Sequence, residues 1–300
     1  MNIESELKDF LRASRAKLLP TDVGLGDSVA QGFISSRRVP GLRREEVALV
    51  AGVSVDYYAR LEQGRTRHVS DAVLSAVASA LRLNGIEKEY LFALVAKKND
   101  VPHASAHGVP ARVKPSVQRT LAAFTTSPAV VMGLGMRILA MNSLARSVYF
   151  DFTKVAPREQ NLARWTFLSP EARILYSDWE TAAAESAAVI RADAGSHPED
   201  AALNELIGEL TVRSEDFRRL WAQHGVHRCG FGTIRLAHPI AGPMSLDYQA
   251  LDVPGEQDQK VVVYMAPEGS PSEDSLRLLS SWTAKTEQAI DVFSPSTRQA

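Results

Sequence analysis

The stretch GLRREEVALVAGVSVDYYARLEQG, residues 41–64, decides the fold of the N-terminal part of the chain. Apolar residues recur at helical spacing on both sides of Gly52, which indicates two short helices joined by a sharp turn. Glycine costs little in the left-handed conformation that ends a helix, and Ser54 can cap the helix that follows. Ala48 is small enough to let the second helix cross closely above the first. The stretch therefore predicts two packed helices with a tight turn between them.

The neighbouring residues predict a complete helical domain around this pair. Residues 5–18 form an amphipathic pattern, and two more helices are expected over 70–81 and 84–95. Residues 20–40 are rich in Gly and Ser and are expected to form a loop. The prediction is an all-α domain of five helices over residues 1–98.

Length and composition limit the class of protein. A chain of 300 residues with 45% hydrophobic content is long enough for about two domains with buried cores. No run approaches the roughly twenty apolar residues of a membrane span, and the first twenty residues alternate charged residues with Leu, unlike a signal peptide. The single cysteine, Cys229, excludes an internal disulfide and a Cys-rich zinc module. These features predict a cytoplasmic protein without a membrane partner.

The charge is unevenly distributed although the net charge is only −1. Residues 1–98 hold 15 Lys and Arg against 12 Asp and Glu, and the remainder holds 19 against 23. A modest basic excess of this kind can supply the salt-dependent attraction to phosphate, although a charge run is more often a solvated face.

The second half of the chain mixes helical and strand-like periods. Residues 99–113 read as a linker, residues 114–282 as the second domain and residues 283–300 as a C-terminal tail. We expect an α+β domain in which a five-stranded antiparallel sheet is covered by helices on one side. The expected strands are 129–132, 137–141, 231–238, 244–253 and 260–264; the expected helices are 115–126, 142–150, 170–194, 200–214, one starting at 214, and 272–281.

A resemblance favours a DNA-binding motif over an ordinary helical hairpin with a solvated polar face. The stretch 41–64 resembles the helix-turn-helix of the lambda-repressor-like, XRE-type regulators, and more specifically the variant of the MmyB-like regulators. The matching residues are Ala48, Gly52, Ser54, Leu61, Glu62 and Gly64.

The second half resembles the MmyB-like ligand-binding domain, whose fold is related to PAS sensor domains. This resemblance implies a ligand-controlled transcription regulator with an apolar cavity that can hold a fatty-acid-like chain. The matching stretches are PAVVMGLGMRILAMNSLAR, FLSPEARILYSDW, SHPED, RSEDFRRLWAQH, HPIAG and the strand 259–267 that leads into GSPSEDSLRLL.

The DNA-binding roles follow from how this class docks, with the second helix in the major groove. Val55, Asp56 and Arg60 lie outward and are expected to read bases, Arg60 through guanine O6 and N7. Arg43, Arg44, Ser54, Tyr57, Arg65 and Arg67 are expected to contact phosphate. The resemblance implies that Glu62 is structural and pairs with Arg15.

The remaining expectations concern the partners. One module buries too little surface to select a site in a genome, so a homodimer on a palindromic operator is expected. No cofactor is expected beyond a possible bound fatty acid or another small apolar ligand. The candidate pocket residues, chosen because they are apolar on the enclosing elements, are Val131, Leu139, Phe167, Leu175 and Leu246.

Two alternatives stay open. One is a dimeric repressor that needs no ligand. The other is a metal-dependent enzyme or sensor built on the cluster His224, His227, Cys229 and His238, whose residue types are those of metal ligands. No catalytic motif such as a Gly-rich phosphate loop or G-x-S-x-G occurs, so we expect no enzymatic activity and no bound metal.

Overall fold

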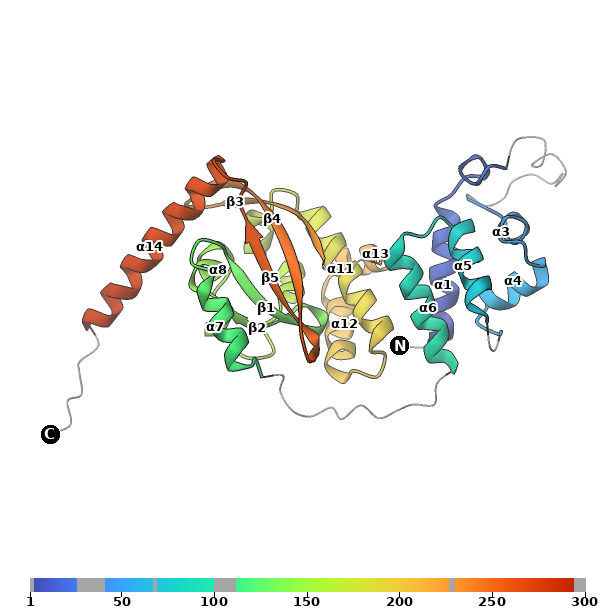
Figure 1. Ribbon diagram of the computed structural model, residues 1–300, viewed down its shortest axis with the longest axis horizontal. Helices are drawn as coiled ribbons and strands as arrows, with labels where there is room; N and C mark the ends of the chain where they lie inside the picture. Colours follow the sequence, from blue (N-terminus) through green and yellow to red (C-terminus); the bar gives the residue numbers. More distant parts are fainter. Residues whose placement is uncertain (1–2, 26–40, 67–68, 100–111, 227–229, 294–300) are drawn as a thin grey trace. The chain divides into compact units, whose positions relative to one another are not determined.

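The computed structural model describes residues 3–25, 41–66, 69–99, 112–226 and 230–293 (Figure 1). The chain divides into two compact units, and the segments of each unit are not contiguous in the sequence. Unit 1 contains residues 1–107, 187–208 and 218–228, and unit 2 contains residues 108–186, 209–217 and 229–300.

Unit 1 contains the predicted helical domain. Its five helices in the first hundred residues confirm the predicted set, with ends that differ by a few residues at most. A 3-10 helix over Pro20–Val23 begins the segment predicted as a loop, and residues 26–40 lie outside the described residues. The five helices are α1 (Ile3–Ala16), α3 (Arg44–Ala51), α4 (Val55–Glu62), α5 (Asp71–Ala80) and α6 (Gly85–Asn99).

The turn between α3 and α4 has the geometry that its sequence predicts. Gly52 has φ 67°, in the left-handed region where a side chain is strained. Ser54 then caps α4, because its Oγ accepts the backbone N–H of Tyr57 at 3.1 Å. At the start of α3, a Glu46 carboxylate oxygen accepts the N–H of Arg43 at 2.7 Å. The starts of both α3 and α4 are therefore fixed by local hydrogen bonds.

The core of this domain is formed by the apolar faces of its helices. Leu7, Phe10 and Leu11 of α1 are buried against apolar residues of the other helices, among them Ala48 and Leu61. Gly41 lies against the C-terminal end of α1, where a side chain would not fit: it has φ +89°, and an added Cβ would lie 2.6 Å from the Cα of Ala16. The same core also contains Ala192 and Val226, which come from much later in the chain.

Unit 2 is built on a five-stranded antiparallel sheet with the order β2-β1-β5-β4-β3 (Figure 1). All five strands were predicted, and the α+β class is confirmed. The last strand in the sequence pairs with the first, so β5 lies in the centre. The strands are β1 (Ala129–Gly133), β2 (Arg137–Met141), β3 (Phe231–His238), β4 (Gly242–Val253) and β5 (Glu256–Met265).

Helices cover both faces of the sheet, so the expectation of helices on one side only was wrong. Val261 and Val263 of β5 pack in one cluster with Leu121 of α7 (Pro115–Ala123). Residues alternate between faces along a strand, so Tyr264 points the other way, where its ring lies 5.3 Å from that of Tyr149. The reason is that β5 is apolar on both faces, as a central strand buried on both sides must be.

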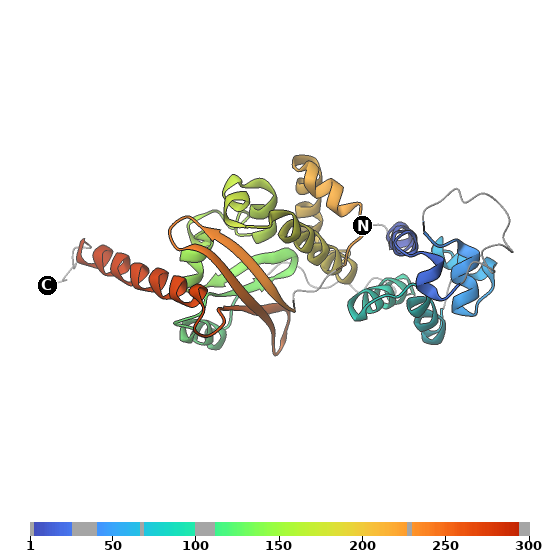
Figure 2. The same ribbon diagram turned by 90° about the horizontal axis from the view of Figure 1, so that it is seen from above.

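Most of the remaining helices follow the predicted ranges, with one interruption, and the helix Leu162–Leu168 was not predicted. The helical segment expected over 170–194 is broken, because Ser177 N–H bonds to the Arg235 carbonyl at 3.0 Å at the edge of β3. Asp178 then caps the next helix through the Thr181 N–H. The last helix is longer than expected (Figure 2). The helices are α8 (Ser143–Val148), α9 (Leu162–Leu168), α10 (Pro170–Leu175), α11 (Trp179–Ser196), α12 (Ala201–Arg213), α13 (Glu215–Trp221) and α14 (Pro271–Phe293), with 3-10 turns over Leu134–Met136 and Phe152–Lys154.

Candidate nucleic-acid interface and ligand cleft

The outward face of α4 carries the three residues predicted to read bases. Val55 is 44% exposed, and Asp56 and Arg60 are more exposed still, with the Arg60 side chain at 57%. Arg60 Nη2 lies 3.1 Å from Asp56 Oδ2 one turn earlier. An exposed pair of this kind adds little stability, but it holds the guanidinium along the helix face. The face therefore presents an oriented cation next to an apolar side chain.

The inward end of α4 is held by Glu62, whose side chain is only 1% exposed. Arg15 of α1 donates from Nε to one carboxylate oxygen at 3.3 Å, as the resemblance implied. Arg44 of α3 donates from Nε and Nη2 to the other oxygen at 2.9 and 2.8 Å. Its hydrogen bonds to Glu62 raise the pKa of Arg44. Glu62 thus joins α1, α3 and α4, a role that sequence reasoning found for Arg15 but not for Arg44.

The other predicted phosphate ligands lie around this face. The hydroxyl of Ser54 is engaged as the cap of α4, and Tyr57, which donates to it, is half-buried. Arg65 is exposed just beyond the helix, and its backbone N–H bonds to the Arg60 carbonyl at 2.8 Å. Arg43 is half-buried at the N-cap of α3. Arg67 lies outside the described residues.

The five predicted pocket residues lie in different parts of unit 2. Val131 packs toward α7, together with the half-buried Leu139. Leu246 lies on the opposite face of the sheet, because its strand register matches the even-numbered residues of β5. Phe167 packs in the helical layer, with its ring 5.1 Å from Phe217, and Leu175 is buried at the end of α10. These side chains belong to separate parts of the core.

A cleft of about 540 Å³ lies instead where α7, the end of β2 and the start of α8 meet. Its apolar lining includes Leu121, Phe124 and Met141, and Arg146 adds a cation that donates to the Met141 carbonyl at 3.3 Å. Ser280 of α14 contributes a hydroxyl. The lining residues are Gln118, Leu121, Ala122, Phe124, Thr125, Ala140, Met141, Asn142, Ser143, Leu144, Arg146 and Ser280.

Asn142 holds the walls of this cleft together. Its Oδ1 accepts the N–H groups of Ala129 at 3.1 Å and Ala145 at 2.8 Å, so it joins β1 to α8. Its Nδ2 donates to the carbonyls of Phe124 and Ser127, both at 2.8 Å. The sequence indicated Asn142 only as a helix cap. Four hydrogen bonds from one buried amide give the cleft a preformed shape.

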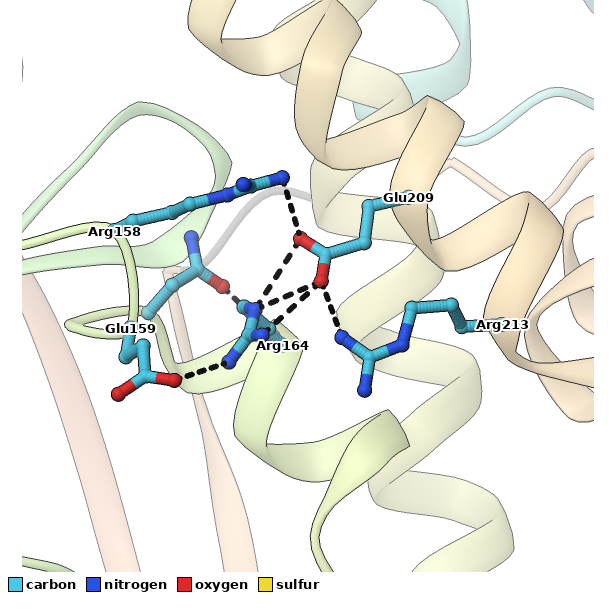
Figure 3. Close-up of polar contacts among 6 residues, drawn as sticks. Arg158, Glu159, Arg164, Glu209 and Arg213 are labelled. Atoms are coloured by element: carbon cyan, nitrogen blue, oxygen red, sulfur yellow. Dashed lines mark hydrogen bonds and ion pairs between the residues drawn. The ribbon is translucent and has the colours of Figure 1, made fainter.

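A second polar feature of unit 2 surrounds Glu209 near the end of α12 (Figure 3). Arg164 donates from Nε to both carboxylate oxygens at 3.2 Å, and Arg213 donates at 2.6 Å. Arg158 lies 3.6 Å away, and Glu159 pairs with Arg164 at the same distance. Burial by itself would raise the pKa of Glu209, but the hydrogen bonds from the arginines lower it. The cluster fastens α12 to the start of α9.

Of the candidate metal ligands, His224 has its Nδ1 3.8 Å from a Glu6 carboxylate oxygen, and His238 has a structural role. His238 Nδ1 accepts the N–H groups of Ile240 and Ala241 at 3.2 and 3.1 Å. Its Nε2 lies 2.9 Å from the Ser147 carbonyl and therefore donates to it, which makes the ring neutral. His227 and Cys229 lie outside the described residues. Within the described part of the chain, no group of three or more His, Cys, Asp or Glu could hold a metal ion.

Comparisons with known proteins match both parts of the chain to family models. Residues 6–91 match the family model of a helix-turn-helix domain. Residues 113–279 match the model of the MmyB-like transcription regulator ligand binding domain, which is more than half of the chain. Comparison with curated proteins gives no match. No helix among the described residues is both long enough and apolar enough to cross a membrane.

Proposed function

The chain belongs to the family of MmyB-like transcription regulators, and on this premise we propose that it is a homodimeric, sequence-specific regulator controlled by a small, largely apolar effector. DNA binding is the part that the α4 face supports most directly. The proposed assembly is a two-fold pair on a palindromic operator, since one module of this size contacts too few bases to select a site. The proposed location of the protein is the cytoplasm, where it would reach chromosomal DNA.

One observation carries the DNA-binding proposal: Arg60 stands on the exposed face of α4 with its guanidinium held by Asp56. A guanidinium presented in the major groove can donate two hydrogen bonds to guanine O6 and N7. Val55, exposed at the N-terminal end of the same helix, suits the methyl group of thymine. Asp56 then has two roles: it orients Arg60, and its carboxylate can accept a hydrogen bond from cytosine.

The test compares Arg60→Ala with Arg65→Ala on an operator selected from random duplex DNA by the full chain. We expect Arg60→Ala to weaken operator binding by about 1–3 kcal/mol and to relax one base position. Arg65→Ala is expected to weaken all sequences alike and to lower the salt slope by about one. Arg44 is a poor control because its side chain also holds Glu62.

The measurements are anisotropy titrations at several salt concentrations. If Arg60→Ala left both affinity and base preference unchanged, α4 would not be the reading helix in the way proposed. An unchanged preference with a lower salt slope would reassign Arg60 to phosphate.

For the effector, we propose the cleft between α7 and α8 as the binding site. Its volume of about 540 Å³ lies in the range typical of small-molecule sites. The apolar lining suits an alkyl or ring system, and Arg146 with Ser280 suits an acidic or polar end group. The chemistry points to a small amphiphilic acid.

The cleft offers a matched pair of variants on α7. Both Ala122 and its neighbour Ala123 are exposed, but only Ala122 lines the cleft. Native mass spectrometry of the full chain with decanoate added should show a dimer that carries the acid. Decanol, which lacks the carboxylate, should bind more weakly. Ala122→Trp should abolish the complex and Ala123→Trp should keep it. A ligand-free monomer, or equal binding by the two variants, would contradict this part of the proposal.

A further inference from the structure

A buried arginine of α11 joins the core of the helix-turn-helix domain inside unit 1. Arg191 is 1% exposed and forms an ion pair with Glu6 of α1, 185 residues away in the sequence. Its guanidinium carbon also lies 3.9 Å from the centre of the Trp221 ring, and Nη2 donates to the Trp221 carbonyl. All these residues belong to the same compact unit. The cation is thus desolvated and fully surrounded by partners.

Glu6 is equally well partnered. The hydroxyl of Tyr90 in α6 donates to Glu6 Oε1 at 2.9 Å, and His224 Nδ1 lies 3.8 Å from the same oxygen. Burial alone would raise the pKa of Glu6, but its contacts, with His224 first and the Arg191 charge next, lower it to about 2. The carboxylate is therefore ionised, and a buried charge of this kind is tolerated only while its partner is in place.

The shapes of the packed surfaces are matched as closely as the charges. Gly195 lies one turn beyond Arg191, and a Cβ added there would come within 2.1 Å of Cε2 of the Tyr90 ring. Ala192 and Val226 complete the apolar core of the five-helix domain. Residues 187–208 and 218–228 therefore supply a cation, a ring-sized gap and apolar contacts to α1 and α6.

Helix α1 connects this contact to the reading helix. Glu6 lies near its N-terminal end, and Arg15, near its C-terminal end, donates to the Glu62 carboxylate that holds α4. Between them, the Phe10 ring packs edge-on against Tyr90 at 5.1 Å. A shift of α1 would therefore disturb both the contacts of Glu6 at one end and the contact of Arg15 with Glu62 at the other.

We propose that residues 187–208 and 218–228 are a positioning element of the DNA-binding unit: docked through Arg191 and Gly195, they hold α1, and through Arg15 and Glu62 they hold α4 in its reading position. This inference rests on the proposed DNA-binding function. Arg191 and Gly195 lie within the stretch that matches the ligand-binding family. In this proposal they nevertheless support DNA binding, although they do not contact DNA. Docking and operator binding are then thermodynamically coupled, so undocking lowers the affinity.

Two glycines in helices of unit 1 provide a paired test in the full chain. Gly195→Ala places a methyl group into the Tyr90 ring, whereas a Cβ at Gly208 of α12 meets nothing within 4 Å. Both substitutions replace a helical glycine by a better helix former. We expect Gly195→Ala to weaken operator binding about tenfold, which corresponds to a coupling within the usual range, and Gly208→Ala to leave it unchanged.

The readouts separate positioning from loss of folded protein. Stoichiometric titration gives the active fraction, and the Kd is compared for that fraction only. Amide hydrogen exchange should show faster exchange in α1 and α4 for Gly195→Ala, and wild-type rates for Gly208→Ala. Equal Kd values and equal exchange for the two variants would overturn the inference.

A double-mutant cycle on the ion pair provides a second measurement that does not depend on Gly195. Arg191→Met and Glu6→Gln should each lower operator affinity, and the double variant should lose no more than the worse single variant, because both remove the same contact. Additive losses would overturn the inference. If the wild-type chain bound no DNA at all, the proposed function would fail, while the exchange rates would still decide whether residues 187–208 and 218–228 hold α1 and α4.

Discussion

At the residue scale, His238 shows how one side chain can make the fold sensitive to acid. Its Nδ1 accepts two N–H groups of the β3–β4 hairpin and its Nε2 donates to the Ser147 carbonyl, so only the neutral ring fits. Burial lowers the pKa of His238 below its ordinary value of 6.5. A proton on Nδ1 would remove the acceptor for both hairpin N–H groups.

We predict an acid-dependent loss of stability at this residue. Between the lowered pKa and 6.5 the unfolded chain binds more protons than the folded chain, so the free energy of unfolding falls as the pH decreases through this window. The contribution is fully present above pH 6.5. His238→Asn keeps an acceptor near Nδ1 but does not titrate, so urea unfolding at pH 7.5 and pH 5.5 should show a smaller loss for this variant. A loss equal to that of the wild type would contradict the assignment.

Glu62 and Arg44 illustrate what residue patterns leave undetermined. The sequence placed Arg44 at a helix N-terminus, where a phosphate contact is the natural expectation, and the structure shows it donating twice to Glu62. The side chain is long enough for either partner, and only the crossing of α3 over α4 decides between them. Predictions of backbone caps such as Ser54 succeeded because a cap involves residues only three apart.

At the scale of elements, α12 is held by one carboxylate among three arginines (Figure 3). Arg164 is mostly buried, whereas Arg158 and Arg213 are exposed, so most of the stabilisation comes from the contact between Arg164 and Glu209. The cluster also lies where residues 158–164 meet β2, because the Gln160 carbonyl accepts the Ile138 N–H at 2.9 Å. The cluster therefore connects α12 to the edge of the sheet at β2.

We predict that Glu209→Gln destabilises unit 2 by about 2 kcal/mol, the usual range for hydrogen bonds to a charged group. The amide keeps the size of the side chain but leaves the Arg164 cation without its counter-charge. Glu199→Gln, at an exposed position, is the matched control and should change the free energy of unfolding by less than about 0.5 kcal/mol. Urea unfolding measures both, and faster hydrogen exchange confined to the C-terminal half of α12 should accompany the first.

The strands and most helices were predictable because their periods are local. The break at residues 176–178 was not, because it depends on a hydrogen bond to Arg235, 58 residues later. The cleft was not predicted for a similar reason: its lining comes mainly from α7, the end of β2 and the start of α8, whereas four of the five predicted residues lie on other elements and fill the core. A cavity forms where side chains do not fill the space between elements, and the periodicity of a sequence does not indicate where this happens.

At the scale of the whole molecule, the two compact units do not follow the two stretches that match family models. Residues 187–208 and 218–228 belong to the unit that contains the helix-turn-helix, although they lie within the stretch 113–279. The sequence could not indicate this, because Glu6 and Arg191 each look like an ordinary surface charge in their own helices. Their pairing becomes visible only when residues 185 positions apart are brought together.

The position of β5 sets the order in which the sheet can be completed. β1 with β2, and β3 with β4, can each close as a hairpin soon after the ribosome has made them, whereas the strand that joins the two hairpins is the last to be synthesised. Until residues 256–265 emerge, both hairpins present unpaired edges, the surfaces at which chains associate wrongly. A nascent chain stopped before β5 should therefore be a preferred client of chaperones, and the final strand acts as the step that commits the domain to its native form.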